Sequence, residues 1–583
     1  MRATLFKEVG YSLSKLIQDI EMGEIGLPDI QRPFVWKNTK VRDLFDSMYR
    51  GFPVGYLLFW ANITPHDTRQ IGINNKQKVP RLLIVDGQQR LTSLYAVLKG
   101  IPVVRENYST EPILIAFRPK DQTFAVTDAA IWKDPEYIPD ISALWQTSRN
   151  RFENSFFERL RNARHVEDYE EDHISEAIDR LYDLQTYPFT VLELSATVSE
   201  QEVADVFVRI NSTGTPLKQA DFILTLMSVF WDIGRTQLEA FCRDARLPQT
   251  NGTSPFNYVI QPDPDQILRV SIGLGFRRAR LQNVYNILRG KDLETEHFSD
   301  DKREKQFSIL QKAQDYVLDL QNWHEFLKCI LRAGYLGAEM IPSQLTLLYT
   351  QVLFLIGKRD FHVEGYQLRN VIARWFFMSA LTSRYVGSFE SVMEQDMAQL
   401  RNLKSADEFV NALDQVIQDT LTESYWSITL PNQELAVSSP RSPSMFAYYA
   451  ALTLLDAKAL FSQLKVHTLL DPAIRAKKSA VERHHLFPKS YLAKHNITEK
   501  RDVNQIANFA LVEWSDNIGI SDKSPAHYYP QYAMRYGTLE LADMHYWHAL
   551  PENWHEMDYE TFLAERRKLI ASVIRDGFAT LYK

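Results

Sequence analysis

The stretch LLIVDGQQRLTSLYAVLKG at residues 82–100 decides the fold of the first part of the chain. Its apolar start predicts a strand, and the apolar residues at helical spacing after the polar turn predict a helix that ends at Gly100. The N-terminus of a helix offers N–H groups without helical partners and a positive dipole, which suit an anionic ligand. The turn is therefore a candidate ligand site, with a capped strand-to-helix turn that binds nothing as the alternative.

Five consecutive residues of this turn are the candidate contacts. Gly87 lets the backbone approach a ligand closely, and Asp86 could cap the helix or hold a metal. Gln88 and Gln89 could bind polar edges, and Arg90 could pair with a phosphate.

Other apolar runs predict strands at residues 54–60 and 186–194, so we expect the first part of the chain to mix helices and strands. Two further stretches are polar within apolar surroundings. QRPFVW carries Gln31 and Arg32, and FVRINSTGTPL carries Arg209 and Asn211. Taken singly, each stretch is typical of a surface turn.

In this order, QRPFVW, VDGQQRLTSL and FVRINSTGTPL resemble the N-terminal domain of the GmrSD-type (type IV) restriction proteins, which is related to the ParB/sulfiredoxin fold. The resemblance covers roughly residues 10–225, and it implies a ParB-like nucleotide-binding and sensing domain at residues 1–215. It also implies that an NTP, either ATP or GTP, binds and is hydrolysed there, although no Walker-type GxxxxGK[ST] motif occurs. The family's nucleotide site falls on Gln31, Arg32, Asp86, Gly87, Gln88, Gln89 and Arg90, and less directly on Arg209 and Asn211.

The remainder of the chain reads as mainly helical. Residues 216–430 form the helical continuation, and within them LTLLYTQVLFLIG (345–357) is too short to span a bilayer and predicts a buried helix. PNQELAVSSPRSPSM (431–445), rich in proline and serine, is the best linker candidate. It precedes a C-terminal helical domain at residues 446–583.

This last domain contains a second motif, RHHLFPKS (483–490) followed by IANFALVEWSDN (506–517). The pattern predicts strand, long loop, strand and helix, and adjacent side chains can converge where a strand ends. A hydrolytic site with one metal needs a metal ligand close to a base. His484 would bind the metal and His485 would deprotonate water. Asn517 would be the second metal ligand, and Asn508 would hold the loop or orient the base.

This set resembles the HNH (ββα-metal) nucleases, a domain that follows the ParB-like one in GmrSD-type proteins. Many HNH sites have Asp where His484 stands. Mg²⁺ or Mn²⁺ suits such nitrogen and oxygen ligands completed by water. Lys489 and Lys523 are candidates for phosphate contact, and FLAERRKLI (562–570) resembles the family's last helix, where Arg566 would be structural or bind phosphate. A competing metal site, HYWH (545–548) with His555, lacks a third ligand motif and instead suggests aromatic packing with exposed histidines.

Composition restricts the partners of the chain. The net charge is −7 and the pI about 6.1, which argues against a protein that coats nucleic acid non-specifically. Residues 472–502 nevertheless carry eight Lys and Arg against three Asp and Glu, around the two histidines. Two distant cysteines and no apolar signal segment predict a cytoplasmic protein without a membrane span.

The resulting hypothesis is an NTP-dependent or NTP-regulated endonuclease that defends against bacteriophage by cleaving modified double-stranded phage DNA. Hydroxymethylated, glucosylated or methylated cytosine are examples of such a modification, and the sequence leaves open which one is recognised. Cutting both strands with one site per chain would favour a homodimer. Two alternatives stay open at this point: an NTP-hydrolysing DNA-binding regulator with a silent nuclease domain, and a toxin-like nuclease.

Overall fold

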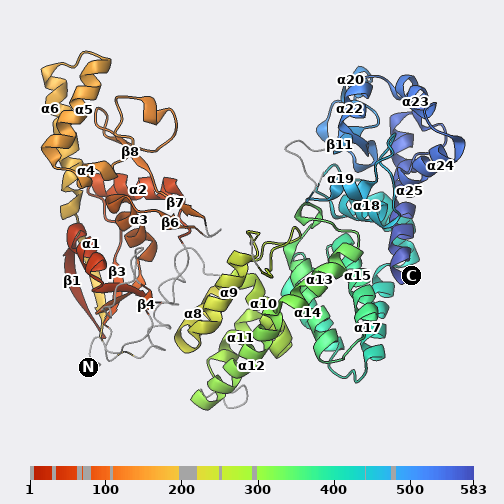
Figure 1. The fold of residues 1–583 in the computed structure, drawn as a ribbon, viewed down its shortest axis with the longest axis horizontal. Coiled ribbons are helices and arrows are strands. Elements are labelled where there is room, and N and C mark those ends of the chain that lie inside the picture. Colours follow the sequence, from red (N-terminus) through yellow and green to blue (C-terminus); the bar gives the residue numbers. More distant parts are fainter. Residues whose placement is uncertain are drawn as a thin grey trace. The chain divides into compact units, whose positions relative to one another are not determined.

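The computed structural model describes residues 5–28, 34–61, 68–69, 81–105, 109–195, 198, 219–248, 252–291, 299–439, 441–473 and 481–583. The chain divides into two compact units, Met1–Ile233 and Gly234–Lys583. Each unit is described by itself (Figure 1).

The first unit is built on a mixed six-stranded sheet with the strand order β1-β10-β3-β5-β2-β4. β10 and β3 run parallel, as do β5 and β2, whereas β1–β10, β3–β5 and β2–β4 are antiparallel. The strands of this sheet are β1 (Phe6–Ser12), β2 (Ile25–Pro28), β3 (Leu57–Ala61), β4 (Thr68–Arg69), β5 (Leu82–Asp86) and β10 (Pro188–Leu194).

Helices and two small hairpins complete this unit. The hairpins are β6–β7 (Val103–Val104, Thr110–Glu111) and β8–β9 (Ile115–Arg118, Thr123–Val126). The helices are α1 (Leu13–Met22), α2 (Asn38–Tyr49), α3 (Gln88–Lys99), η1 (Ile131–Lys133), α4 (Ser142–Gln146), α5 (Arg149–Ala163), α6 (Asp168–Tyr182), η2 (Asp183–Thr186) and α8 (Gln219–Phe230).

The two faces of the sheet are buried unequally. Leu57 and Phe59 of β3 join the large core that α1, α2 and α3 complete. Leu58, between them, joins a smaller cluster with Val85 and Leu194. Successive side chains of a strand point to opposite faces, so the covered face of the sheet is the one that carries α3 and the turn before it.

In its described residues, the second unit is helical apart from the two-stranded sheet of β11 and β12. Its elements are α9 (Asp232–Asp244), α10 (Pro264–Phe276), α11 (Leu281–Leu288), α12 (Asp300–Leu318), α13 (Leu320–Arg332), η3 (Ala338–Met340), α14 (Gln344–Arg359), α15 (Gly365–Leu381), α16 (Phe389–Gln399), α17 (Ala406–Thr420), the π-helix η4 (Tyr425–Glu434), α18 (Pro443–Leu454), α19 (Val466–Leu470), β11 (Val481–His485), α20 (Lys489–Lys494), α21 (Lys500–Val503), η5 (Ile506–Asn508), β12 (Phe509–Glu513), α22 (Trp514–Ile520), α23 (Pro525–Ala533), α24 (Thr538–Trp547), η6 (Trp554–Glu556), α25 (Tyr559–Ala579) and η7 (Thr580–Tyr582).

The helices of this unit pack around α14 and α15, whose side chains are buried over most of their length. α18 packs against both α15 and α25. Its approach to α25 is close, because a Cβ at Gly577 would lie 2.6 Å from Cβ of Ala451. The stretch predicted as a linker, residues 431–445, overlaps the end of η4 and the start of α18 inside this one unit.

The structure confirms the coarse fold class: an N-terminal sheet with helices, followed by a helical remainder. The apolar run at 345–357 is the buried helix α14, as predicted. In the part of the chain that the structure covers, no helix is both long and apolar enough to cross a membrane.

Candidate functional site

The strand-to-helix turn of the first unit has the predicted geometry. β5 ends at Asp86, and α3 begins at Gln88. Gly87 between them has φ 97°, and a Cβ at this position would lie 2.3 Å from Cδ2 of Leu57. Only glycine fits both constraints, and it has no side chain to cap α3. The first-turn N–H groups of this helix therefore face the turn, as an anion site requires.

Arg90 holds a neighbouring loop through hydrogen bonds to its backbone. Its Nη1 donates to the carbonyl of Val54 and its Nη2 to the carbonyl of Tyr56, both at 2.7 Å. Nη2 also lies 3.2 Å from Oδ2 of Asp86, and the side chain is only 15% exposed. Burial lowers the pKa of the guanidinium, and Asp86 opposes that shift. Arg90 thus holds the loop at residues 51–56 against the turn, and its contact with a phosphate stays a prediction.

The two glutamines of the turn lie half-buried on the first turn of α3. Oε1 of Gln89 accepts a hydrogen bond of 2.9 Å from the backbone N–H of Val35, which ties α3 to the segment after the QRP motif. The other residues predicted for this site, Gln31, Arg32, Arg209 and Asn211, lie outside the described residues.

In the second unit, the two predicted strands and the helix form consecutive elements. β11 and β12 pair antiparallel, with His484 opposite Ala510 and His485 opposite Phe509. α22 follows β12 directly and packs against both strands. Short helices occupy the connection that the sequence predicted as a long loop. This is a ββα arrangement.

The two histidines lie at the end of β11 in different surroundings. His484 is 4% exposed, and its ring meets the ring of Tyr528 edge-on at 5.9 Å. His485 is half-buried, and its ring packs on Phe509 at 4.5 Å. Both residues pair in register within β11, and strand alternation alone would direct their side chains to opposite faces. Their described ring contacts are with different residues, and their convergence on one metal site stays a prediction.

His485 has the environment of a base. Its Nε2 lies 3.0 Å from Oδ1 of Asn504. Because a carboxamide oxygen only accepts, this contact places the proton on Nε2 and leaves Nδ1 as an acceptor. Burial lowers the pKa of the imidazole, Asn504 raises it, and the charge of Lys489 lowers it. The net direction favours the neutral ring at neutral pH.

Asn508 fastens the segment that follows the histidines. It is fully buried, and its Oδ1 accepts from the N–H of Phe487 at 2.8 Å. Its Nδ2 donates to the carbonyls of Phe487 at 3.1 Å and Val503 at 3.0 Å. All of these described contacts are to backbone groups, which matches the loop-holding role of the two predicted for Asn508. Tyr528 assists from α23, since its hydroxyl donates to the carbonyl of Leu486 at 2.8 Å.

The remaining predicted residues differ in accessibility. Asn517 lies on α22, and its side chain is outside the described ones. Lys489 is exposed at the start of α20, whereas Nζ of Lys523 donates to the carbonyl of Gly519 at 3.0 Å. Arg566 is fully buried on α25.

The described hydrogen bonds of Arg566 go to backbone carbonyls, and its guanidinium also lies 5.8 Å from the centre of the Phe562 ring. Its Nη1 donates to Ala507 at 2.7 Å, and its Nε and Nη2 donate to His548 at 3.1 and 3.0 Å. A guanidinium with this burial and these partners favours the structural one of its two predicted roles.

The competing histidine motif is part of the aromatic core. His548 is fully buried rather than exposed, and its Nε2 lies 2.9 Å from the carbonyl of Lys458. Nε2 of His545 lies 2.6 Å from the hydroxyl of Tyr529, and His555 packs on the same tyrosine ring at 4.6 Å. Among the described residues, no three His, Cys, Asp or Glu side chains form a group that could hold a metal.

Two residues of the site were missed from the sequence. Asn504 and Tyr528 contact the histidine segment from a loop and from α23. Neither residue belongs to the motif from which the site was predicted, so no sequence signal marked them.

Comparison with known proteins gives one family and one relative. The uncharacterized protein MJ0686 of Methanocaldococcus jannaschii is 22% identical over 552 residues, which covers 89% of this chain and 86% of that protein. Residues 13–228 match the family model described as GmrSD restriction endonuclease, N-terminal domain, which supports the GmrSD restriction endonuclease family for this chain.

Proposed function

We propose that this protein is a GmrSD-type restriction endonuclease that cleaves modified double-stranded DNA at an HNH-type site in its second unit. The first unit would bind an NTP and sense the modification. The family match of residues 13–228 supports the restriction role and DNA as the partner. The observation that carries the nuclease assignment is the ββα arrangement that places His485 beside Asn504.

In this proposal, His485 acts as general base. Asn504 keeps the proton on Nε2, so Nδ1 takes a proton from the attacking water. The lowered pKa keeps the ring neutral at neutral pH, which a base requires. Asn508 and Tyr528 act as positioning residues, because they fix the backbone that follows the histidine.

The donor set fits a divalent ion such as Mg²⁺ or Mn²⁺ in part. His484 on β11 and Asn517 on α22 come from elements that pack together, and they offer a nitrogen and an oxygen donor. With two protein donors, water and DNA oxygens would complete the coordination. Bound there, the ion would supply charge stabilisation at the scissile phosphate. Lys489, exposed beside His485, is the described cation best placed for a DNA phosphate.

The first unit contributes the nucleotide site in this proposal. The N-terminus of α3, whose N-cap Gly87 has no side chain, would bind the phosphates of ATP or GTP at the positive end of its dipole. Gln31 and Arg32 would join it from the QRP motif. Because Arg90 connects this turn to the loop at residues 51–56, nucleotide binding at the turn would affect the conformation of that loop.

A gel assay tests the proposal. The full chain would be incubated with Mg²⁺ or Mn²⁺, with and without NTP, on matched phage DNAs that differ only in cytosine modification. Cleavage of the modified DNA alone is expected. Equal cleavage of both DNAs would remove the sensing role. Hydrolysis of NTP without any cleavage would instead favour an NTP-driven DNA-binding regulator whose nuclease domain is silent.

A further inference from the structure

A cavity of about 300 Å³ opens in the first unit, and its lining includes no residue of the turn at residues 86–90. It lies between the end of α2, the turn that joins β8 to β9, and α6. Its lining residues are Tyr49, Arg50, Phe52, Asp121, Gln122 and Arg180. This volume is at the small end of ligand sites, which suits a single ring system better than a chain segment.

The floor of this cavity is aromatic and its rim is open. Tyr49 is 4% exposed and packs on Phe117 at 5.2 Å, with its hydroxyl donating to the carbonyl of Ala177 at 3.3 Å. The guanidinium of Arg180 lies 4.8 Å from the centre of the same ring, and Phe52 at the rim is 58% exposed. Phe52 and Arg180 therefore give the cavity two flat side chains of the kind on which nucleobases stack.

The loop that carries Phe52 is fastened on both sides. The hydroxyl of Tyr187 donates to the carbonyl of Phe52 at 2.7 Å. Arg90 holds the carbonyls of Val54 and Tyr56. The backbone that follows Phe52 is therefore held by the same arginine that belongs to the predicted nucleotide turn, and Tyr187 holds the carbonyl of Phe52 itself.

The polar groups of the cavity come from the β8–β9 turn. Gln122 has φ 54°, a left-handed conformation that favours glycine, and its side chain lines the cavity. Asp121 accepts from Nε of Arg118 and from Oγ1 of Thr123, both at 2.8 Å. A carboxylate has further lone pairs, so Asp121 can still accept from an amino group of a ligand.

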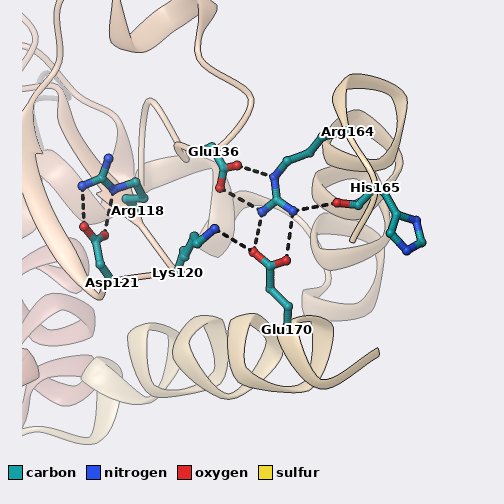
Figure 2. A network of polar contacts seen from close by, with 7 residues as sticks. All are labelled: Arg118, Lys120, Asp121, Glu136, Arg164, His165 and Glu170. Carbon is teal, nitrogen blue, oxygen red and sulfur yellow. Dashed lines mark hydrogen bonds and ion pairs between the residues drawn. The ribbon is translucent and has the colours of Figure 1, made fainter. Parts of the chain in front are cut away.

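An ion-pair network holds this turn against α6 (Figure 2). Lys120, next to Asp121, lies 3.2 Å from Oε1 of Glu170 on α6. Arg164, at the end of α5, donates to the same carboxylate at 2.5 and 2.9 Å and also pairs with Glu136. Hydrogen bonds from Arg164 lower the pKa of Glu170, so the network stays charged. The two walls of the cavity are thus held in place before any ligand enters, which reduces the cost of binding.

We propose that this cavity takes a cytosine-type base turned out of a DNA duplex. The ring would lie between Phe52 and Arg180, and Asp121 would accept from its exocyclic amino group, the contact that carboxylates make with cytosine. The amide of Gln122 would meet the neighbouring ring edge, and Arg50 would face the flanking phosphate. The inference rests on the proposed function, because it names the site where that function would read the base.

The test measures binding by fluorescence anisotropy with the full chain in the His485→Ala background, so that no duplex is cut. Three duplexes serve as probes: fully paired, with one cytosine opposite an abasic site, and with one thymine opposite an abasic site. An unpaired base does not have to be pulled from its partner, so the cytosine probe should bind about tenfold more tightly than the paired duplex. The thymine probe lacks the amino group and should show a smaller preference.

Two variants remove the cavity's contacts without removing its core. Gln122→Gly deletes the amide, and glycine suits the left-handed backbone there, so the fold is kept. Arg180→Ala deletes the stacking surface. Both should reduce the cytosine preference to less than about twofold, on the tenfold scale above. Arg42→Ala on α2, a cation outside the cavity that pairs with Asp43, is the control and should keep the full preference.

The outcomes separate this inference from the proposed function. A preference that survives both cavity variants overturns the inference, even if modified DNA is cut as proposed. If free dCMP binds to the wild type but not to the two variants, and no duplex is preferred, the cavity takes a free nucleotide. The proposal of a base from DNA is then overturned. If both variants lose the cytosine preference and the chain cuts no DNA, the proposed base-binding role of the cavity is supported and the proposed nuclease activity is overturned.

Discussion

Replacing Asn508 by alanine tests whether this residue holds the backbone of the candidate nuclease site or takes part in the cleavage reaction. The change removes three buried hydrogen bonds and leaves the N–H of Phe487 and the carbonyls of Phe487 and Val503 without this partner. At about 1 kcal/mol net for each bond, with more where a buried group stays unsatisfied, the free energy of unfolding should fall by about 3 kcal/mol. That is on the order of a hundredfold in the ratio of folded to unfolded protein.

Asn508→Asp sharpens this prediction. A carboxylate can still accept from Phe487, but it cannot donate to the two carbonyls, and it places a charge in a fully buried position. The aspartate variant should therefore be no more stable than the alanine variant.

Two measurements check the prediction. Denaturant unfolding gives the overall loss, with Asn283→Ala, at an exposed position of α11, as the control. Hydrogen exchange of a peptide around Phe487 should show lost protection in Asn508→Ala and native protection in His485→Ala. If Asn508→Ala were as stable as the control and yet failed to cut DNA, Asn508 would act in the cleavage reaction. The claim that it stabilises the backbone around Phe487 would then be refuted.

Three further changes have defined outcomes. Burial lowers the pKa of His548 to about 3, so this ring is neutral in the folded protein. At a pH below the usual pKa of histidine, the ring therefore binds a proton when the chain unfolds. Stability should then fall by about 1.4 kcal/mol per pH unit from that proton as pH drops below about 6.5, and His548→Gln should reduce this slope in pH-dependent unfolding. Arg164→Ala should lower the stability of the first unit by about 1–3 kcal/mol, measured by calorimetry, because the partly exposed guanidinium joins Glu136 and Glu170. A loss equal to that of the control Arg42→Ala, which removes a half-buried arginine paired only with its neighbour Asp43 in the described contacts, would contradict this. Arg90→Lys loses the paired contacts with Val54 and Tyr56, so hydrogen exchange in residues 51–56 should rise and NTP binding should weaken; unchanged exchange would show that the loop is held by other contacts.

The sequence was most informative where local rules dominate. The strand before Asp86, the glycine at position 87 and the helix end at Gly100 follow from hydrophobic spacing and from the backbone freedom of glycine, and all are present. The strand that begins at Phe509 was also predicted from a short apolar run, and the strand that ends at His485 from the layout of the motif.

Contacts between distant segments were out of reach of this reasoning. The bonds of Arg90 to Val54 and Tyr56, of Asn504 to His485, and of Arg566 to His548 depend on how segments pack, and no residue spacing encodes them. For the same reason the buried state of His548 was missed, since its burial depends on how the end of α24 packs.

The most direct test of the account is the single-turnover rate of cleavage of modified DNA by the wild-type chain and by His485→Ala, with hydrogen exchange confirming that both are folded. Loss of a general base should lower this rate by about 10²–10⁴-fold, without changing the affinity for DNA. A rate in His485→Ala equal to that of the wild type would contradict the assignment of this histidine and, with it, the nuclease site at the end of β11.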